Sequence, residues 1–217
     1  MEDDCKSTKP VVHVVDDDPP VRRALSRLLH SHGFRVELFS SAEELLQHRC
    51  HSPGNPGCVI ADLQLPGLNG LDLQETLRKE DEPLPVIFLT GHGDIRSSVR
   101  AMKGDAVDFL TKPVSESDLI PAIKRALAAD AEARKERRQK RELLARYKEL
   151  TPREREVMAM VVRGLLNKQI AFELGTVERT IKAHRAQIMA KMQVQSLAEL
   201  VRVSGRLGDV AIREEAT

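Results

Sequence analysis

The sequence predicts two domains of different class, an α/β domain with a parallel sheet followed by an all-helical domain. Within residues 1–130, five short apolar runs alternate with segments of helical periodicity, a pattern typical of a parallel sheet covered on both faces. After residue 149 only helical patterns occur, separated by glycine-containing turns. The charge divides in the same way. Residues 1–130 hold 15 basic and 21 acidic side chains (net −6), whereas residues 151–206 hold 10 and 5 (net +5), so the second module is predicted to face a polyanion.

Composition limits the class of protein further. The chain has 217 residues and is 41% hydrophobic, which suffices for a buried core, and with 3% aromatic residues this core is predicted to be aliphatic. Cys5, Cys50 and Cys58 lack metal-ligand spacing and are predicted to be free thiols. No apolar run approaches the ~18 residues of a membrane span, and the acidic start lacks a signal-peptide core. We therefore expect a soluble cytoplasmic protein without a membrane partner, with residues 1–9 as a disordered tail.

The predicted strands share one feature, a polar residue where the apolar run ends. Because the carboxyl ends of parallel strands meet at one edge of a sheet, these polar side chains are expected to lie together. Carboxylates, a hydroxyl and an ammonium group would then converge. The strands and their polar ends are Val11–Val15 with Asp16, Asp17 and Asp18; a third strand ending at Asp62; Val86–Leu89 with Thr90; and Ala106–Leu110 with Lys112, while residues 34–39 form the second strand.

Helices are predicted between these strands. Pro19-Pro20 opens the first, where proline is tolerated, and Gly33 stops it. Asp18 is interpreted as the N-cap of this helix rather than as a metal ligand. The other helices of this domain are predicted to begin near Ser41, to follow Pro66-Gly67 with leucines 68, 71, 73 and 77, to run from Asp94 to Met102, and to begin at Ser117.

Asp16-Asp17, Asp62, Thr90 and Lys112-Pro113, in this order and at these strand ends, resemble the receiver domain of bacterial response regulators. The resemblance covers about residues 10–128. It implies a flavodoxin-like (βα)5 fold of strand order 2-1-3-4-5, with the site at the topological switch point. It also implies a partner histidine kinase that phosphorylates Asp62, and a cis peptide bond before Pro113.

The chemistry of the residues agrees with this resemblance. An aspartate is a competent nucleophile for phosphoryl transfer, but its charge repels the phosphoryl group. Mg²⁺ removes that repulsion and prefers oxygen ligands. The resemblance assigns the Mg²⁺ ligands to Asp16, Asp17, Asp62 and the backbone carbonyl of Gln64, and the switch residues to Thr90, Phe109 and Lys112.

Some interpretations stay open in this domain. Phe109 is either an aromatic ring that turns inward on activation, as in the family, or an ordinary core residue. His13, on the first strand, is interpreted as a satisfied core residue rather than a catalyst. The run Gly91 to Asp94 resembles the FixJ subgroup, whereas Gly104-Asp105 departs from the Ala-Gly of that subgroup.

The segment from Ser117 to Lys148 is predicted to be one long helix, of which residues 129–148 form the linker. It contains no glycine, its only proline is Pro121 in the expected first turn, and Ala, Arg, Lys and Glu favour helix. The alternative is a flexible charged linker. Its few leucines, Leu127, Leu143 and Leu144, are too sparse to predict a coiled coil, although a dimer contact is left open.

The second module is predicted to be a four-helix domain with a helix-turn-helix. Thr151, Pro152 and Glu154 form a capping box before the first helix, which Gly164 ends. The remaining predicted elements are a short helix capped by Asn167 and ending at Leu174, a turn at Gly175, a helix from Glu178 to Met192, and a helix capped by Ser196 from Leu197 to Val203, with residues 208–217 as a tail.

The motifs Thr151 to Glu154, Asn167 to Ala171 and Thr180 to Arg185 resemble the LuxR/NarL-type DNA-binding domain over about residues 145–207. Joined to the receiver, they make the chain similar to FixJ/NarL-type regulators, including FixJ and StyR-like proteins. One departure is Val177, where the family usually has a capping residue: either Thr176 caps the helix one residue early, or the helix start is less well held.

Double-stranded promoter DNA is the partner implied for this module. We expect Lys182 and Ala183 to face base edges and Ala186 to lie near a thymine methyl. The side chains expected to hold the DNA backbone are Arg179, Thr180, His184 and Arg185, and Lys168 and Lys191 complete the predicted DNA-binding set.

The predicted function is a two-component response regulator and not an enzyme. Phosphorylation of Asp62 would promote a homodimer whose two modules bind half-sites ~34–36 Å apart and regulate transcription with RNA polymerase. Two alternatives remain. One is a phosphorylation-independent DNA-binding regulator; the other is a Mg²⁺-dependent phosphotransferase or phosphatase, disfavoured because Gln64 stands where such enzymes carry a general acid.

Overall fold

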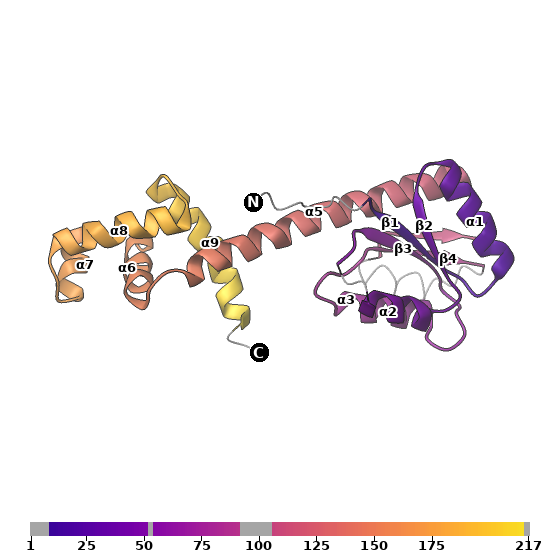
Figure 1. Cartoon of the computed structure of the whole chain (residues 1–217), viewed down its shortest axis with the longest axis horizontal. Coiled ribbons are helices and arrows are strands. Elements are labelled where there is room, and N and C mark those ends of the chain that lie inside the picture. The colour runs from indigo at the N-terminus through magenta and orange to yellow at the C-terminus, as the bar shows by residue number, and fades with distance from the viewer. Residues whose placement is uncertain (1–8, 52–53, 92–105, 215–217) are drawn as a thin grey trace. The chain divides into compact units, whose positions relative to one another are not determined.

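The computed structural model describes residues 9–51, 54–91 and 106–214, with side chains up to residue 207 (Figure 1). The predicted helix from Asp94 to Met102, the subgroup motif beyond Gly91 and the Gly104-Asp105 turn lie outside the described residues, as does nearly all of the predicted tail 1–9. The chain divides into two compact units, Met1–Arg134 and Lys135–Thr217, and each is described by itself.

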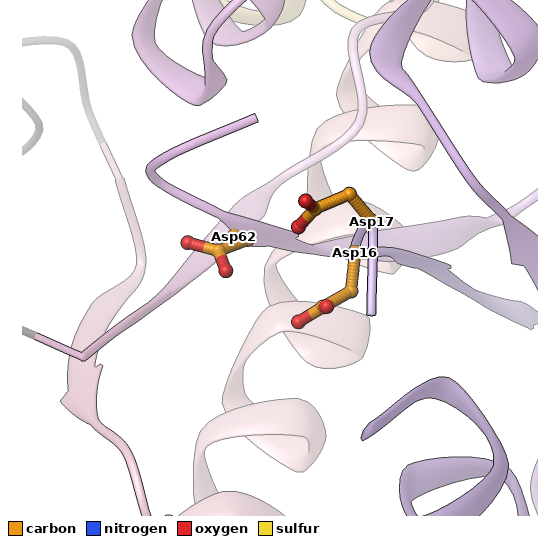
Figure 2. Close-up of side chains that lie close together, drawn as sticks. All are labelled: Asp16, Asp17 and Asp62. Atoms are coloured by element: carbon orange, nitrogen blue, oxygen red, sulfur yellow. The ribbon is translucent and has the colours of Figure 1, made fainter. Parts of the chain in front are cut away.

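The first unit contains a five-stranded parallel sheet of order β2-β1-β3-β4-β5, which confirms the predicted order. Val15 pairs with Ala61, so the residues that follow, Asp16 and Asp62, lie side by side at the sheet edge (Figure 2). The fifth strand begins later than the predicted Ala106, because its pairing with β4 starts at Asp108, opposite Ile87. The strands are β1 (Val11–Val15), β2 (Arg35–Phe39), β3 (Gly57–Asp62), β4 (Val86–Thr90) and β5 (Asp108–Thr111).

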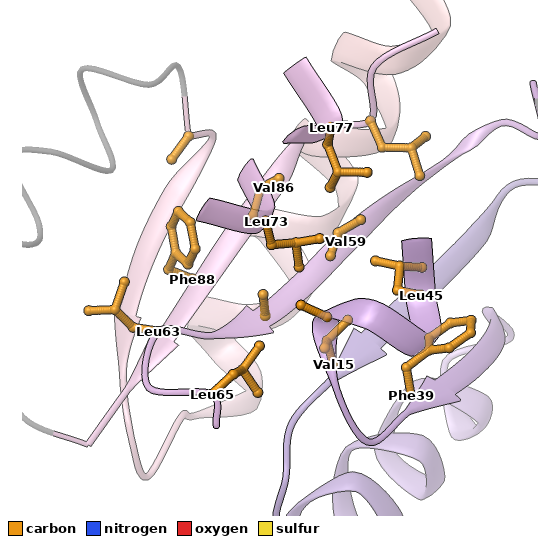
Figure 3. Close-up of a cluster of buried hydrophobic side chains, with 14 residues drawn as sticks. Val15, Phe39, Leu45, Val59, Leu63, Leu65, Leu73, Leu77, Val86 and Phe88 are labelled. Carbon is orange, nitrogen blue, oxygen red and sulfur yellow. The ribbon is translucent and has the colours of Figure 1, made fainter. Parts of the chain in front are cut away.

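Both faces of the sheet are covered, which explains why its strands read as continuous apolar runs. Val59 and Ala61 of β3 point into one core, which α2 (Ala42–His51) and α3 (Gly70–Arg78) cover (Figure 3). Cys58 and Ile60, the alternate residues, point into the other core, covered by α1 (Pro19–Ser31) and the first part of α5 (Glu116–Lys148). The sheet is therefore a buried platform that holds its carboxyl edge in place.

The start of α1 is as predicted, although its capping side chain acts differently, and the predicted start of α3 needs correction. Asp18 occupies the N-cap of α1 with extended backbone, but its side chain makes no capping hydrogen bond; its backbone N–H donates to Asp16 Oδ1 at 2.9 Å instead. The helix predicted from Leu68 begins at Gly70, because the Asn69 side chain caps it by accepting from the N–H groups of Leu71 and Asp72. Short polar side chains thus organise both turns beside the sheet edge.

The long helix α5 is confirmed and is continuous from Glu116 to Lys148, with Pro121 beyond its first turn. Leu143, left open as a dimer contact, is buried in the core of the second unit, and Leu144 packs against the same core. Leu127 packs against the first unit's core. All three leucines therefore pack against the core of the unit to which they belong.

An arginine anchors α5 to the opposite, amino-terminal edge of the sheet. Arg134 donates from Nε to Asp130, from Nη1 to the Gly54 carbonyl at 2.6 Å, and from Nη2 to the Asn55 carbonyl at 2.7 Å. The buried Asp130 carboxylate also accepts from the Gly57 N–H at the start of β3 at 2.9 Å. This network ties the helix to the loop before β3, and the sequence pattern did not predict it.

The second unit is all-helical, as predicted. Gly175 has φ of 60°, a conformation that favours glycine, and it makes the turn between α7 and α8. The last helix extends to Glu214 rather than ending at Val203, so residues 208–214 are helical and not a tail. The helices that follow α5 are α6 (Pro152–Val162), α7 (Asn167–Glu173), α8 (Glu178–Met192) and α9 (Leu197–Glu214).

The cap of α7 differs from the prediction. Asn167 is the first helical residue and Leu166 is the N-cap, whose N–H donates to Gln169 Oε1 at 2.8 Å. The Asn167 side chain is engaged elsewhere, because its Oδ1 accepts from Arg185 Nη1 at 3.1 Å. A residue predicted to cap one helix therefore joins it to the next.

The capping box at the start of α6 is confirmed. Thr151 Oγ1 accepts from the Glu154 N–H at 3.2 Å, and the Glu154 carboxylate accepts from the Thr151 N–H at 2.8 Å. Replacing Thr151 with alanine is expected to lower the free energy of unfolding of the second unit by about 1 kcal/mol, because one backbone donor loses its partner. Urea denaturation followed by far-ultraviolet circular dichroism measures this. Thr151→Ser keeps the hydroxyl and should stay close to the parent; equal losses in both variants would contradict the capping role.

Candidate functional site

Three carboxylates converge at the carboxyl edge of the sheet. Asp16 and Asp17 follow β1, Asp62 ends β3, and Figure 2 shows their side chains directed toward a common region. One oxygen atom of each lies within 4.8 Å of the others. Asp16 and Asp62 are buried, whereas Asp17 is exposed. Such a set of hard oxygen donors, open to solvent on one side, fits a divalent cation that prefers oxygen ligands.

Lys112 joins two of these acids. Its Nζ donates to Asp16 Oδ2 at 2.6 Å and to Asp62 Oδ2 at 2.5 Å. Burial alone would lower the pKa of Lys112, but the hydrogen bonds and charges of the two carboxylates outweigh it and raise the pKa above its ordinary value. The ammonium group therefore stays charged and neutralises part of the acidic cluster. The predicted cis peptide bond between Lys112 and Pro113 is confirmed.

The loop after β3 fixes the Asp62 carboxylate. Its Oδ1 accepts from the Gln64 N–H at 2.9 Å, so Gln64, the predicted carbonyl ligand, is placed directly beside it. The start of α3 comes so close that a Cβ on Gly70 would lie 2.5 Å from the Asp62 carbonyl oxygen. Only glycine permits this approach. The local sequence thus orients the Asp62 carboxylate through Gln64 and lets α3 start against the Asp62 backbone through Gly70.

Thr90 and Phe109 lie on the neighbouring strands. Thr90 ends β4 and is fully buried, and its carbonyl accepts from the Lys112 N–H at 2.7 Å. Phe109 is partly buried on β5 and packs against the core, with its ring centroid 6.4 Å from that of Phe88. Thr90 is therefore linked to the lysine of the cluster, and the inward-turning role of Phe109 stays a prediction.

Two residues near β1 differ from or add to the sequence interpretation. Arg22 of α1 donates from Nη1 to the Asp16 carbonyl, a contact that a basic residue in the first turn after an acidic triplet could have suggested.

His13 is buried as predicted, but it is not satisfied: within the described part of the chain neither ring nitrogen has a hydrogen-bond partner. The interpretation of His13 as a satisfied core residue is therefore wrong.

The helix α8 has one buried and one exposed face. Ile181, Ile188 and Met192 are buried against the second unit's core. The opposite face carries most of the side chains predicted to bind DNA, and Lys168 is exposed on α7. On α8, Arg179, Lys182, Ala183 and Ala186 are exposed, and Thr180, His184 and Arg185 are partly buried.

Lys191 is placed differently from the other predicted DNA contacts. Its Nζ donates to the Glu154 carboxylate at 2.7 Å and to the Glu149 carbonyl at 3.3 Å. The hydrogen bond from Lys191 is the main cause that lowers the pKa of Glu154 below its ordinary value. Lys191 thus stabilises the junction of α8 with α6 in this structure, and its contact with DNA stays a prediction.

Comparison with known families covers both units. Residues 12–124 match the response regulator receiver domain, and residues 148–204 match the bacterial regulatory proteins of the luxR family. The chain belongs to the LuxR-type response regulators. It is a two-component regulator of transcription, and the predicted fold class and family resemblance are confirmed.

Relatives of this response regulator match along nearly its whole length. Nodulation protein W of Bradyrhizobium diazoefficiens is 46% identical over 211 residues, which cover 97% of this chain and 92% of that protein. Response regulator protein TodT of Pseudomonas putida F1 is 45% identical over 199 residues, covering 92% and 87%. A solved structure of the response regulator StyR has a TM-score of 0.82 at 46% identity and covers 92% of this chain and 100% of that one. These relatives therefore share both the receiver domain and the DNA-binding domain with this chain.

Membership of this family defines the general function of this response regulator. A receiver joined to a LuxR-type domain implies a histidine kinase and DNA as partners. The family consists of transcription regulators rather than classical enzymes, which gives no support to the phosphotransferase alternative. Among the described residues, no helix combines the length and apolar character needed to cross a membrane.

Proposed function

We propose that Asp62 accepts a phosphoryl group from a histidine kinase and that this modification controls DNA binding by the second domain. The observation that carries the proposal is the junction of three carboxylates and Lys112 at the ends of β1, β3 and β5. In functional terms, residues 10–128 would be the receiver, 129–148 the linker and 149–207 the DNA-binding domain. The protein would act in the cytoplasm, where kinase and DNA meet.

The transfer itself requires a carboxylate that can reach phosphorus. An Asp62 oxygen attacks the phosphohistidine of the kinase; an O–P bond forms as the N–P bond breaks, and the imidazole nitrogen leaves with the bonding pair. Lys112 Nζ, already in contact with Asp62, is positioned to stabilise a phosphoryl oxygen. The Gln64 N–H holds the nucleophilic carboxylate in its orientation.

The acidic cluster fits Mg²⁺, since it offers hard oxygen ligands on one side of the sheet. Asp16, Asp17, Asp62 and the Gln64 carbonyl would hold the ion, directly or through water. When bound, Mg²⁺ supplies the positive charge that offsets repulsion between the phosphoryl group and the carboxylates. Arg22 keeps the loop that carries Asp16 and Asp17 in register by binding the Asp16 carbonyl.

Phosphorylation would then change the strand ends beside Asp62. The group adds a charge of about −1.5 to −2, which draws Lys112 Nζ away from the Asp16 carboxylate. The Thr90 hydroxyl turns toward the phosphoryl oxygens, and the Phe109 ring follows into the space behind it. The surface beyond β4 and β5 is altered as a result, and receivers pair through it.

Paired receivers would bring two DNA-binding domains together. Helix α8 enters the major groove at each half-site, with Lys182 and Ala183 facing base edges and Arg179 on the backbone. The half-sites lie ~34–36 Å apart, one helical turn of DNA. The bound dimer then regulates transcription by contacting RNA polymerase.

The decisive experiment is a phosphorylation assay with a small phosphodonor and Mg²⁺. The full-length protein is expected to take up one phosphoryl group, located at Asp62 by mass spectrometry and lost slowly. Asp62→Asn should remain unlabelled and should fail to activate a promoter reporter. Asp72→Asn, which changes a partly exposed acid of α3 outside the carboxylate cluster, is the matched control and should behave as the parent.

Other results would favour the alternatives. Rapid multiple turnover of the phosphodonor would indicate an enzyme rather than a switch. Unchanged promoter binding and activation by Asp62→Asn would show that the regulator works without phosphorylation.

A further inference from the structure

The N-cap of the recognition helix α8 breaks a local rule of helix formation. Val177 holds this position with extended backbone (φ −105°, ψ 152°), and its carbonyl accepts from the N–H groups of Thr180 and Ile181. A valine side chain cannot accept a hydrogen bond, so no side-chain cap is made. Thr176 does not replace it, because the residue in the N-cap position is Val177. The alternative in which Thr176 caps the helix one residue early is therefore wrong, and a less well held helix start stays a prediction.

Valine gains nothing from burial at this position either. Its side chain is 64% exposed, while the neighbouring core of the domain is closed by Ile170, Ala171 and Ile181. Serine or threonine there would cap the helix and suit the solvent better. Where a residue breaks a local rule without compensation inside the fold, its role is expected to lie outside the fold.

The location of Val177 indicates what that role is. In helix-turn-helix proteins the first residues of the recognition helix contact base edges in the major groove. The exposed basic side chains of Arg179 and Lys182 follow on the same helix and suit the flanking phosphates. The only apolar group that a base presents in the major groove is the 5-methyl group of thymine, which favours apolar contacts.

We infer that Val177 packs against a thymine 5-methyl group and thereby selects thymine at one position of each half-site. This inference rests on the proposed docking of α8 in the major groove and adds a specificity determinant to it. Val177 lies outside the set Lys182, Ala183 and Ala186 considered from the sequence. The contact is apolar and uncharged, so it changes which sequence is bound rather than how strongly any DNA is attracted.

The test removes the methyl group alone. The phosphodonor-treated full-length protein first selects its preferred duplex from a randomised pool of double-stranded DNA. Each thymine of that duplex is then replaced by uracil, in both half-sites at once, and affinity is measured at fixed salt. For the parent, one replacement is expected to weaken binding about fourfold per half-site, the value for burying one methyl group at ~0.8 kcal/mol.

A variant of Val177 tests whether the methyl-sensitive thymine is the one that the Val177 side chain contacts. In Val177→Ser the same thymine and uracil duplexes should bind equally, while discrimination at all other positions stays as in the parent. Val177→Ser restores a capping hydroxyl, so its thermal unfolding should occur at the same or a higher temperature, which excludes misfolding as the cause. Val201→Ser makes the same change at an exposed valine of α9 and should keep the fourfold preference.

The outcomes separate this inference from the proposed function. A parent protein that selects a sequence yet tolerates uracil at every thymine overturns the inference and leaves DNA binding intact. So does a Val177→Ser variant that retains the full preference; Val177 would then face another partner, such as a protein. A parent that selects no sequence at all overturns both.

Discussion

Replacing Lys112 with methionine is expected to lower the free energy of unfolding of the receiver domain by about 3 kcal/mol when divalent cations are removed. Methionine retains the length of the side chain but deletes the ammonium group that bridges Asp16 and Asp62. Asp16 is 1% exposed and the Asp62 side chain 12% exposed, so water cannot take over the lost neutralisation. Two adjacent carboxylates then remain uncompensated.

Mg²⁺ should reverse most of this loss. Because Lys112 and a bound cation both neutralise the same carboxylates, removing the lysine leaves more negative charge for the ion. Lys112→Met is therefore expected to bind Mg²⁺ more tightly than the parent, although phosphoryl transfer to Asp62 is impaired. Urea denaturation in EDTA and in saturating Mg²⁺, with isothermal titration of Mg²⁺, measures both effects.

A surface ion pair provides the control for Lys112. Lys79 pairs with Glu75 across one helical turn of α3, and both side chains are about three-quarters exposed. Lys79→Met should change stability by less than about 0.5 kcal/mol, with or without Mg²⁺. If Lys112→Met is as stable as the parent in EDTA, the bridge between Asp16 and Asp62 contributes nothing to the fold.

The site at the sheet edge could be predicted because strand direction and residue type agree. Asp16, Asp62 and Lys112 each follow an apolar run, and parallel strands bring such positions to one edge. The exposed face of α8 was predictable for a similar reason, since helical periodicity separates Ile181 and Ile188 from the basic residues. In both cases a regular element places the side chain.

Contacts between distant loops and side chains were not predictable in this way. Nothing periodic links Arg134 to the Gly54 and Asn55 carbonyls, and nothing in the sequence indicates that Lys191 pairs with Glu154. Such contacts depend on where a long side chain finds a partner after the elements pack. The same limit explains why Asn167, a good capping residue by type, binds Arg185 instead.

His13 shows this limit most clearly, since the sequence predicts that it lies in the core but does not predict which groups surround it. Its Nδ1 lies 3.5 Å from Glu37 Oε2, which His48 also approaches at 3.1 Å. Burial, followed by the positive charges of Arg49, His48 and Arg35, lowers the pKa of His13 from 6.5 to about 4. The native protein thus keeps a neutral imidazole where the unfolded chain would be protonated.

The receiver domain should therefore lose stability in mild acid. Between pH 6.5 and 4 the unfolded state binds a proton that native His13 refuses, so the His13 contribution is complete above pH 6.5 and falls by about 3 kcal/mol toward pH 4. His13→Leu should remove this part of the pH dependence. It should also raise stability near neutral pH by about 1 kcal/mol, because an unpaired polar ring is replaced by an apolar group of similar size.

Urea denaturation of the parent and His13→Leu at a series of pH values isolates the contribution of His13 to stability, because the other groups that titrate in this range are common to both proteins. His30→Leu changes a solvent-exposed histidine of α1 and should leave the acid sensitivity of the parent in place. If His13→Leu and the parent lose stability in parallel from pH 6.5 to 4, His13 is protonated in the native state. Glu37, whose side chain is 26% exposed, would then be the group that pairs with the imidazolium charge.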